Sequence, residues 1–166
     1  MKRREFLGSC ALGATVAAGS YAMPKTVRAA GDAAKRKIDA EKLTESAYQH
    51  FIPGQRTCCE SILLAGCEAL AIKSDLVPDI ALGLAGGVGL QGDICGVLTS
   101  SAMVLSLAVA KTESDYPKKE MQTLQAVGRL HRTFQKQFGH TDCRSLCGLD
   151  LTTPEDRKKL MQSVKA

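Results

Sequence analysis

Apolar residues recur every three or four positions along most of this chain, and no stretch alternates apolar with polar residues over the length of a strand. Leu43, Ala47 and Phe51 show the pattern plainly. Side chains at this spacing share one face of an α-helix, whereas alternation would indicate a β-strand. Because 166 residues suit one hydrophobic core rather than two, the sequence predicts an all-α fold, a compact single-domain bundle of several helices.

Glycine, proline and polar capping residues divide the chain into segments of helical length. Ser74 and Asp75 are expected to cap a short third helix, and Gly139 to end a long one. Thr141 is the expected cap of the short turn that follows. The helices are expected over residues 43–51, 57–72, 74–84, 94–110, 117–138, 143–147 and 153–165.

Two of these segments bear most on the core. Residues 94–110 are apolar nearly all round, so we expect a central helix buried by its neighbours. Four Ser and Thr residues within 17 positions argue against a membrane span, which needs about 20 apolar residues. The long amphipathic helix is expected to bury one stripe, made of Met121, Leu124, Val127, His131, Phe134 and Phe138.

The N-terminus has the order of an export signal. Arg3 and Arg4 stand before Glu-Phe-Leu and resemble the twin-arginine motif. A weakly apolar stretch rich in Ala, Gly and Ser follows, and the small side chain of Ala29 ends a cleavage site. We therefore expect a periplasmic or other extracytoplasmic protein that is exported folded. Its parts would be a signal at residues 1–29, a charged tether at 30–42 and a helical cysteine-rich domain at 43–166.

The expected signal also holds most of the excess positive charge. The chain carries 22 Lys and Arg against 17 Asp and Glu, a net charge of +5. Five of those bases and one acid lie in residues 1–29, so the mature chain would have a net charge of +1. With no basic excess and 4% aromatic residues, it lacks the electrostatic and stacking features of a nucleic-acid-binding protein. We expect no nucleic-acid partner and a mature form that is not embedded in a membrane.

Six cysteines remain after removal of the signal: Cys58, Cys59, Cys67, Cys95, Cys143 and Cys147. An even number in an exported protein would ordinarily form disulfides. Cys58 and Cys59 are neighbours with Cα atoms about 3.8 Å apart, below the usual disulfide range. Cys143 and Cys147 would share a helical face with Cβ atoms about 5–6 Å apart, too far for a relaxed disulfide. That spacing suits two thiolates holding one metal or cluster.

Local environment separates the roles of these cysteines. Cys59 and Cys67 share a face with apolar residues, and we expect both to be buried, inert thiols. Cys58 and Cys95 each begin a helix, where the helix dipole lowers the pKa of a thiol and favours the thiolate. The four sulfurs expected to converge are those of Cys58, Cys95, Cys143 and Cys147.

Three segments resemble the C_GCAxxG_C_C family of redox-active proteins, within a similarity that spans about residues 48–153. They are residues 57–65, where the family has a cysteine opening a helix; 86–96, its glycine-rich block with a cysteine; and 142–150, its C-terminal element. Val97 stands where the family has Ala, and Ser100 where it has Gly. The resemblance implies a helical redox or electron-transfer protein with an iron–sulfur centre, in which Cys58 rather than Cys59 is the first family cysteine.

Other motifs in the sequence give weaker support for a bound cofactor. Residues 87–92 spell GxGxxG, but a dinucleotide site needs a strand before the glycines, and the preceding segment has helical caps. Covalent haem needs C-x-x-C-H, which the sequence lacks. His131 lies on the apolar stripe and is expected to be a packing residue, whereas His140 is an auxiliary ligand candidate. We expect neither haem nor a nucleotide.

Two redox functions and one structural role remain open. The first is electron transfer by an iron–sulfur cluster, or another metal such as zinc, because thiolates are soft ligands. Its ligands would be Cys58, Cys95, Cys143 and Cys147. The second is metal-free thiol–disulfide chemistry, an oxidoreductase activity with Cys58 or Cys95 as the attacking thiol. The third is an interaction module stapled by disulfides. The sequence favours the iron–sulfur centre, and it does not identify the redox partner protein.

Overall fold

The structure, a computed structural model, describes residues 38–165 of the chain. This part contains helices and no β-strand, apart from one isolated antiparallel bridge between Ile94 and Asp142. The all-α prediction is therefore confirmed. The elements are α2 (Ala40–Phe51), α3 (Cys58–Ala69), the 3-10 helix η2 (Asp79–Leu84), α4 (Gly96–Ala110), α5 (Tyr116–Phe138), α6 (Cys143–Cys147) and α7 (Pro154–Lys165).

The expected export signal, residues 1–29, and most of the expected tether lie outside the described residues. The described chain reaches α2 through Asp39, whose Oδ1 accepts hydrogen bonds from the backbone N–H of Glu41 at 3.0 Å and Lys42 at 3.2 Å. Such a cap satisfies N–H groups that the first helical turn leaves without partners. The last residues of the expected tether are therefore already helical.

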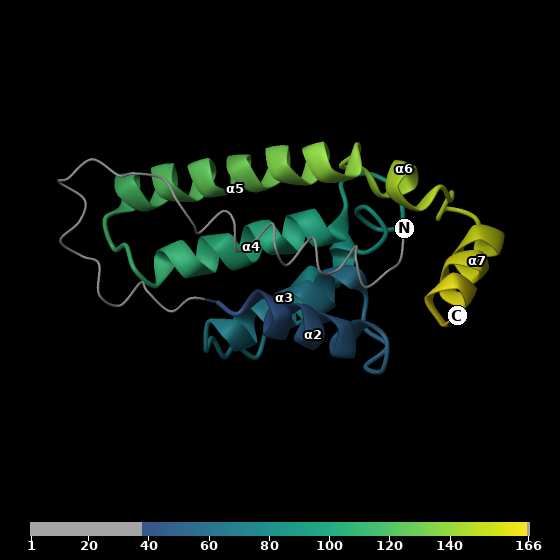
Figure 1. Cartoon of the computed structure of the whole chain (residues 1–166), viewed down its shortest axis with the longest axis horizontal. Helices are drawn as coiled ribbons and strands as arrows, with labels where there is room; N and C mark the ends of the chain where they lie inside the picture. The colour runs from purple at the N-terminus through teal and green to yellow at the C-terminus, as the bar shows by residue number, and fades with distance from the viewer. Residues whose placement is uncertain (1–37, 166) are drawn as a thin grey trace.

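The longer helices pack in chain order. α2 packs on α3, α3 on α4 and α4 on α5, while η2 covers part of α3 and α4. Figure 1 shows α4 between α5 on one side and the α2–α3 pair on the other. At Gly66 of α3 an added Cβ would lie 2.3 Å from Cγ2 of Val104 in α4. The missing side chain therefore lets these two helices approach closely.

Two groups of buried side chains form the core. The first joins α2, α3, α4 and α5 and includes Leu43, Ala47, Ile62, Leu98, Leu130 and Phe134. The second lies between α3, η2 and α4 and contains Cys59, Leu63, Cys67, Ala81 and Val104. The burial expected for Cys59 and Cys67 is confirmed, since their exposed fractions are 0% and 3%.

Burial of α4 differs between its two halves. The last buried position is Leu105, whereas Leu107, Ala108 and Val109 are partly exposed and Ala110 is exposed. The prediction of a central helix buried by its neighbours is therefore not confirmed. Among residues 38–165, no helix combines the length and apolar character that crossing a membrane requires.

The ends of α5 agree with the sequence, but its buried face does not. Asp115 caps the helix, accepting from the backbone N–H of Lys118 at 3.2 Å, and Gly139 ends it in a left-handed conformation. The buried positions are Ala126, Leu130 and Phe134, and the expected stripe is wrong at its start, where Met121 and Leu124 are exposed. Apolar spacing names candidate faces, and the neighbouring elements decide which face is covered.

The third helix was expected as an α-helix over residues 74–84. The chain instead makes turns from Asp75 and enters η2 only at Asp79, while Ser74 accepts from the backbone N–H of Leu76. Pro78 lies in the middle of the stretch, and a proline has no N–H to give to an α-helical hydrogen bond. This prediction is corrected to a turn followed by a 3-10 helix.

Candidate functional site

One end of the bundle gathers the starts of α3 and α4 and the whole of α6. Cys58 is the first residue of α3, Cys95 is the N-cap of α4, and Cys143 and Cys147 are the first and last residues of α6. Cys95 is buried, and Cys58 packs against the same core group. The structure thus brings together the four cysteines that the sequence singled out.

A glycine-rich loop between η2 and α4 sets the position of Cys95. Five successive residues, 86–90, have positive φ angles, so the chain turns in the left-handed sense that L side chains disfavour. At Gly87 (φ +75°) an added Cβ would lie 2.4 Å from the carbonyl oxygen of Asp93. The loop can close on itself there only because Gly87 has no side chain.

Two backbone hydrogen bonds join the end of this loop to α6. The N–H of Cys95 donates to the carbonyl of Thr141 at 2.8 Å, and the N–H of Cys143 donates to the carbonyl of Asp93 at 2.7 Å. These bonds flank the bridge between Ile94 and Asp142. Cys95 and Cys143, 48 residues apart in sequence, are therefore held on adjacent stretches of antiparallel backbone.

Arg144 closes the same junction from its outer side. Its backbone N–H donates to the carbonyl of Gly92 at 3.1 Å, and its Nη2 donates to the carbonyl of Gln91 at 3.2 Å. The same Nη2 pairs with Asp150 Oδ1 at 3.2 Å. An added Cβ at Gly92 would lie 2.9 Å from Nε of Arg144. One side chain thus ties the glycine-rich loop, α6 and the segment after α6 together.

Gly96 brings the start of α4 against the start of α3. An added Cβ at Gly96 would lie 3.0 Å from Sγ of Cys58 and 3.1 Å from the carbonyl oxygen of Leu84. A larger residue would have to displace the side chain of Cys58. The missing side chain at position 96 therefore lets the starts of α3 and α4 approach closely.

The short helix α6 presents its two thiols one turn apart, as expected from their i, i+4 spacing. Asp142, not Thr141, is its N-cap, and Asp142 Oδ1 accepts from the backbone N–H of Ser145 at 2.7 Å. Thr141 lies one residue before the cap, and its carbonyl accepts from Cys95 in the bridge to the loop. Gly148 ends the helix in the left-handed conformation.

The thiols act on one another electrostatically. Burial, together with the nearby thiols of Cys95 and Cys147, raises the pKa of Cys143 to about 12. Burial also raises the pKa of Cys95, outweighing the backbone N–H groups at the start of α4 that favour its thiolate. The lowered pKa expected for Cys95 is therefore wrong, because desolvation of a charged thiolate exceeds the effect of the helix start.

The thiol with the lowered pKa is that of Cys59, not that of Cys58 as expected. The hydrogen bond that Cys58 shares with Cys59, together with burial, raises the pKa of Cys58 well above its usual range. Cys59 accepts that bond and a second one from Thr57, whose Oγ1 lies 3.1 Å away, and its pKa falls to about 6. Cys59 is buried as predicted, but the expectation of an inert thiol is corrected.

The apolar neighbours of Cys59 in the sequence predict its burial but not the hydrogen bonds that lower its pKa. A signal was available in Thr57, which caps α3 and forms a capping box with Glu60. A residue two positions after such a cap lies within reach of the cap hydroxyl and of the free N–H groups of the first turn. Cys59 occupies that position.

The other candidates lie apart from this cluster of five thiols, which comprises Cys58, Cys59, Cys95, Cys143 and Cys147. Cys67 is buried in the second core group, and burial together with Glu68 raises its pKa. His131 is partly buried on α5, and His140 is exposed on the loop before α6. The GxGxxG segment follows η2 rather than a strand, so it lacks the strand that a dinucleotide fingerprint requires.

Comparison with known proteins assigns the chain to a family. Residues 56–165 match the family described as "Putative redox-active protein (C_GCAxxG_C_C)". The chain is also similar to an uncharacterized protein of Archaeoglobus fulgidus, with 32% identity over 134 residues that cover 76% of this chain and 88% of the other. No solved structure gives a significant match. The match contains all five thiols of the cluster, and the chain belongs to the C_GCAxxG_C_C family of redox-active proteins.

Proposed function

We propose that this chain is an exported electron-transfer protein with an iron–sulfur cluster held by Cys58, Cys95, Cys143 and Cys147. The observation that carries the proposal is the convergence of these thiols from three elements far apart in sequence. Thiolates that lie close together repel one another, which is why the neighbouring thiols raise the pKa of Cys143. Their convergence as thiolates therefore does not stabilise the fold by itself. A bound centre that carries positive charge would stabilise the thiolates.

The donor set fits an iron–sulfur cluster in number and in chemical type. Such clusters are held by four cysteine thiolates, which are soft ligands suited to iron. Among the described residues, no three His, Cys, Asp or Glu side chains are placed to hold a single metal ion. Four thiolates would also suit zinc, but zinc has no redox chemistry, and the family is described as redox-active, so we propose the cluster.

A bound cluster would supply one-electron transfer, and the chain's own residues would tune it. The backbone N–H groups of Val97 and Leu98 favour negative charge on the sulfur of Cys95. Hydrogen bonds to ligating sulfurs and exclusion of solvent are the main protein influences on the potential of such a centre. Cys95 is 5% exposed, so the start of α4 would be one such influence on the potential.

A second function, thiol–disulfide exchange without metal, is favoured by the contact between Cys58 and Cys59. The anion of Cys59 would attack one sulfur of a partner disulfide and release the other as a thiol. Cys58 would then attack the mixed disulfide, lose its proton and release the second partner thiol. The chain would end with a disulfide and the partner with two thiols. The burial of Cys59 and the strain of a disulfide between adjacent residues count against this function.

Metal and sulfide analysis of the full chain tests the first proposal. The protein is purified without oxygen from a host that assembles iron–sulfur clusters, and iron, zinc and acid-labile sulfide are measured per chain together with the visible spectrum. We expect iron and sulfide in comparable amounts and a colour that reduction bleaches. Protein that contains neither iron nor sulfide would overturn the proposal.

Single substitutions show which thiols are ligands. Cys95→Ser, Cys143→Ser and Cys147→Ser are each expected to lower the iron content and change the visible spectrum, because a serine oxygen is a poor ligand for a soft centre. Cys67→Ala is the matched control, since Cys67 is buried in the second core group. A loss of iron with Cys67→Ala as large as with the other variants would show that the loss reflects unfolding rather than removal of a ligand.

Mapping of cysteine pairs distinguishes the remaining functions if no cluster is found. Metal-free thiol–disulfide exchange predicts a disulfide that forms and opens reversibly in defined redox buffers, and that is lost in Cys58→Ser. An interaction module predicts disulfides that persist in every buffer. Free thiols under all conditions would contradict both.

A further inference from the structure

Two of the four proposed ligands lie on α6, a short helix that contributes little to the core. None of its five residues is buried, and only partly buried Leu146 packs against the first core group. Cys58 and Cys95, in contrast, lie at the starts of α3 and α4, whose buried side chains form the core. The position of Cys143 and Cys147 relative to Cys95 therefore depends on contacts other than apolar burial.

Arg144, which lies between those two cysteines, supplies such contacts. Its backbone N–H donates to the carbonyl of Gly92 at 3.1 Å, and its Nη2 donates to the carbonyl of Gln91 at 3.2 Å. Both carbonyls belong to the glycine-rich loop that leads into Cys95. The same Nη2 lies 3.2 Å from Asp150 Oδ1. Because this ion pair is exposed, it contributes little by itself, and the bonds to the loop carry the attachment.

The loop is shaped to accept the arginine side chain. Gly92 has a φ of +77°, and an added Cβ would lie 2.9 Å from Nε and 3.0 Å from Cβ of Arg144. A residue with a side chain at position 92 would therefore displace the arginine. Gly89 in the same loop also has a positive φ, +64°, but an added Cβ there would meet nothing within 4 Å. At Gly92 the arginine adds to the backbone's own requirement for glycine.

We propose that Arg144 is a positioning residue that holds Cys143 and Cys147 beside Cys95. The proposal rests on the proposed function for the role of these thiols as ligands. Arg144 acts through the backbone, because its bonds to residues 91 and 92 keep α6 on the loop while the hydrogen bonds that flank the bridge between residues 94 and 142 stay closed. Without its side chain those backbone bonds remain, so α6 would open more often rather than detach.

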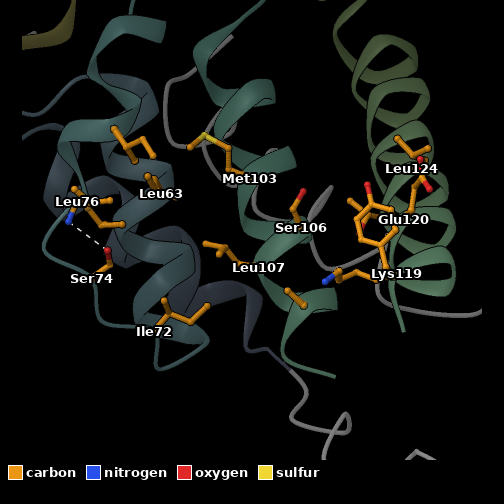
Figure 2. Close-up of a pocket in the computed structure, with 15 residues that line it drawn as sticks. Leu63, Ile72, Ser74, Leu76, Met103, Ser106, Leu107, Lys119, Glu120 and Leu124 are labelled. Carbon is orange, nitrogen blue, oxygen red and sulfur yellow. Dashed lines mark hydrogen bonds between the residues drawn. The ribbon is translucent and has the colours of Figure 1, made fainter. Parts of the chain in front are cut away.

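The apolar groove at the opposite end of the bundle is a region that this opening should not affect. Its volume is about 590 Å³, and it is lined by residues of α3, α4, segment 72–80 and the start of α5. Figure 2 shows Leu63, Met103 and Leu107 of α3 and α4 among them. None of the five cluster thiols lines this groove. Leu124→Ala, at an exposed position in the groove, is therefore a control for general loosening of the bundle.

Alkylation of the cysteines tests the position of α6 whether or not the chain binds a cluster. The full chain is treated with a reductant and an iron chelator and exposed to N-ethylmaleimide, and mass spectrometry follows the labelling of each cysteine. Cys95 is 5% exposed and should react slowly in the wild type. In Arg144→Ala it should react about two- to tenfold faster, as the loss of one hydrogen bond allows. Cys67, 3% exposed in the second core group, should keep its rate.

Arg157→Ala is the matched control for the loss of an arginine. Arg157 Nη1 donates to the carbonyls of Leu151 and Thr152 at 3.2 and 3.3 Å, neither of which belongs to the glycine-rich loop. This variant and Leu124→Ala should leave the labelling rate of Cys95 unchanged. Helical content measured by circular dichroism shows that each variant is folded.

A pair of glycine variants tests the contact from the side of the loop. Gly92→Ala should speed the labelling of Cys95 as Arg144→Ala does, because the new methyl group displaces the arginine. Gly89→Ala also places a side chain at a positive φ, but it meets no neighbour. It should have the smaller effect, since it carries the backbone strain without the displacement.

The chain with its cluster gives a second readout. Arg144→Ala should shift the reduction potential and the visible spectrum and release iron to a chelator about two- to tenfold faster. Arg144→Lys should restore part of the wild-type behaviour, because an ammonium group can still donate to the carbonyl of Gln91. A wild-type chain without iron overturns the proposed function, while the labelling still decides the role of Arg144. Unchanged labelling of Cys95 in Arg144→Ala, or an equal increase in Arg157→Ala, overturns the present proposal.

Discussion

At the scale of single residues, Ser100 is a buried hydroxyl that the fold leaves unsatisfied. It is 0% exposed in the middle of α4, and its Oγ has no hydrogen-bond partner within the described part of the chain. A buried hydroxyl without a partner costs free energy, since it has given up its hydrogen bonds to water. Ser100 stands where the family sequence has Gly, so the chain tolerates this cost at a position where a smaller residue would avoid it.

The first residue-scale prediction follows from that hydroxyl. Ser100→Ala is expected to raise the free energy of unfolding by about 1–2 kcal/mol, because it removes a buried polar group without creating a large cavity. Urea unfolding followed by circular dichroism measures the change. The matched control is Ser61→Ala: Ser61 is also 0% exposed, but its Oγ donates to the carbonyl of Thr57 at 2.7 Å. The control should lose about 1 kcal/mol. Equal losses in both variants would contradict the interpretation.

At the scale of elements, α2 and α3 are joined by polar contacts as well as by the core. Glu68 near the end of α3 accepts from Ser46 Oγ at 2.5 Å and pairs with His50 Nε2 at 2.9 Å. Burial raises the pKa of Glu68, but the hydrogen bonds from Ser46 and His50 outweigh it, so the pKa is lowered overall. The carboxylate therefore favours the packed form of the two helices.

The element-scale prediction concerns acid. Because the pKa of Glu68 is lower in the folded chain than its ordinary value of 4.5, its contribution to stability is fully present above about pH 4.5. The contribution is lost as the pH falls through the lowered value. Glu68→Gln should cost about 0.2–1 kcal/mol at neutral pH, since Glu68 is half exposed, and the difference from wild type should shrink below pH 4.5.

Unfolding in urea between pH 3 and 7 would measure this dependence. Glu45→Gln is the control, because Glu45 bonds Gln49 at 2.7 Å within α2 and does not join the two helices. A Glu68→Gln difference that stays constant over this range, or that Glu45→Gln reproduces, would show that Glu68 does not join α2 to α3 as proposed.

At the scale of the whole molecule, the two ends of the bundle have different properties. One end holds five thiols among tightly joined loops, and the other holds the open apolar groove. The helices between them form the core and separate the two surfaces. The candidate redox site and the exposed apolar surface therefore lie at opposite ends of the same bundle.

The whole-molecule prediction concerns export. We propose that residues 1–29 direct the folded chain across a membrane by the twin-arginine route, which suits a centre assembled before export. Replacing Arg3 and Arg4 by Lys together should leave the protein in the cytoplasm with its N-terminus uncut. Cell fractionation and mass measurement of the N-terminus check this. Lys25→Gln lies outside the paired arginines and should still be exported and cut before Ala30. Export of the double variant at the wild-type level would contradict the proposal.

Much of the local structure could be predicted because its causes lie within a few residues. Asp115 and Gly139 bound α5 in the structure as they do in the sequence, since capping and left-handed glycine are local properties. The turn of α6 between Cys143 and Gly148 was predicted for the same reason. The capping residues at the start of segment 74–84 predict an α-helix, but Pro78 lacks the N–H that an α-helix needs, and the chain forms turns and a 3-10 helix instead.

The sequence by itself determined that the chain is all-α and where most helices begin and end. It also identified Cys58, Cys95, Cys143 and Cys147 as the candidate site. Only the tertiary structure decided which thiol has the lowered pKa, because that depends on the burial of Cys95 and on the contact between Cys58 and Cys59. It also decided that Leu124 lines an open groove rather than the core. Hydrogen bonding and apolar periodicity act over one or two turns, whereas desolvation and the covering of a face depend on elements far apart in the chain.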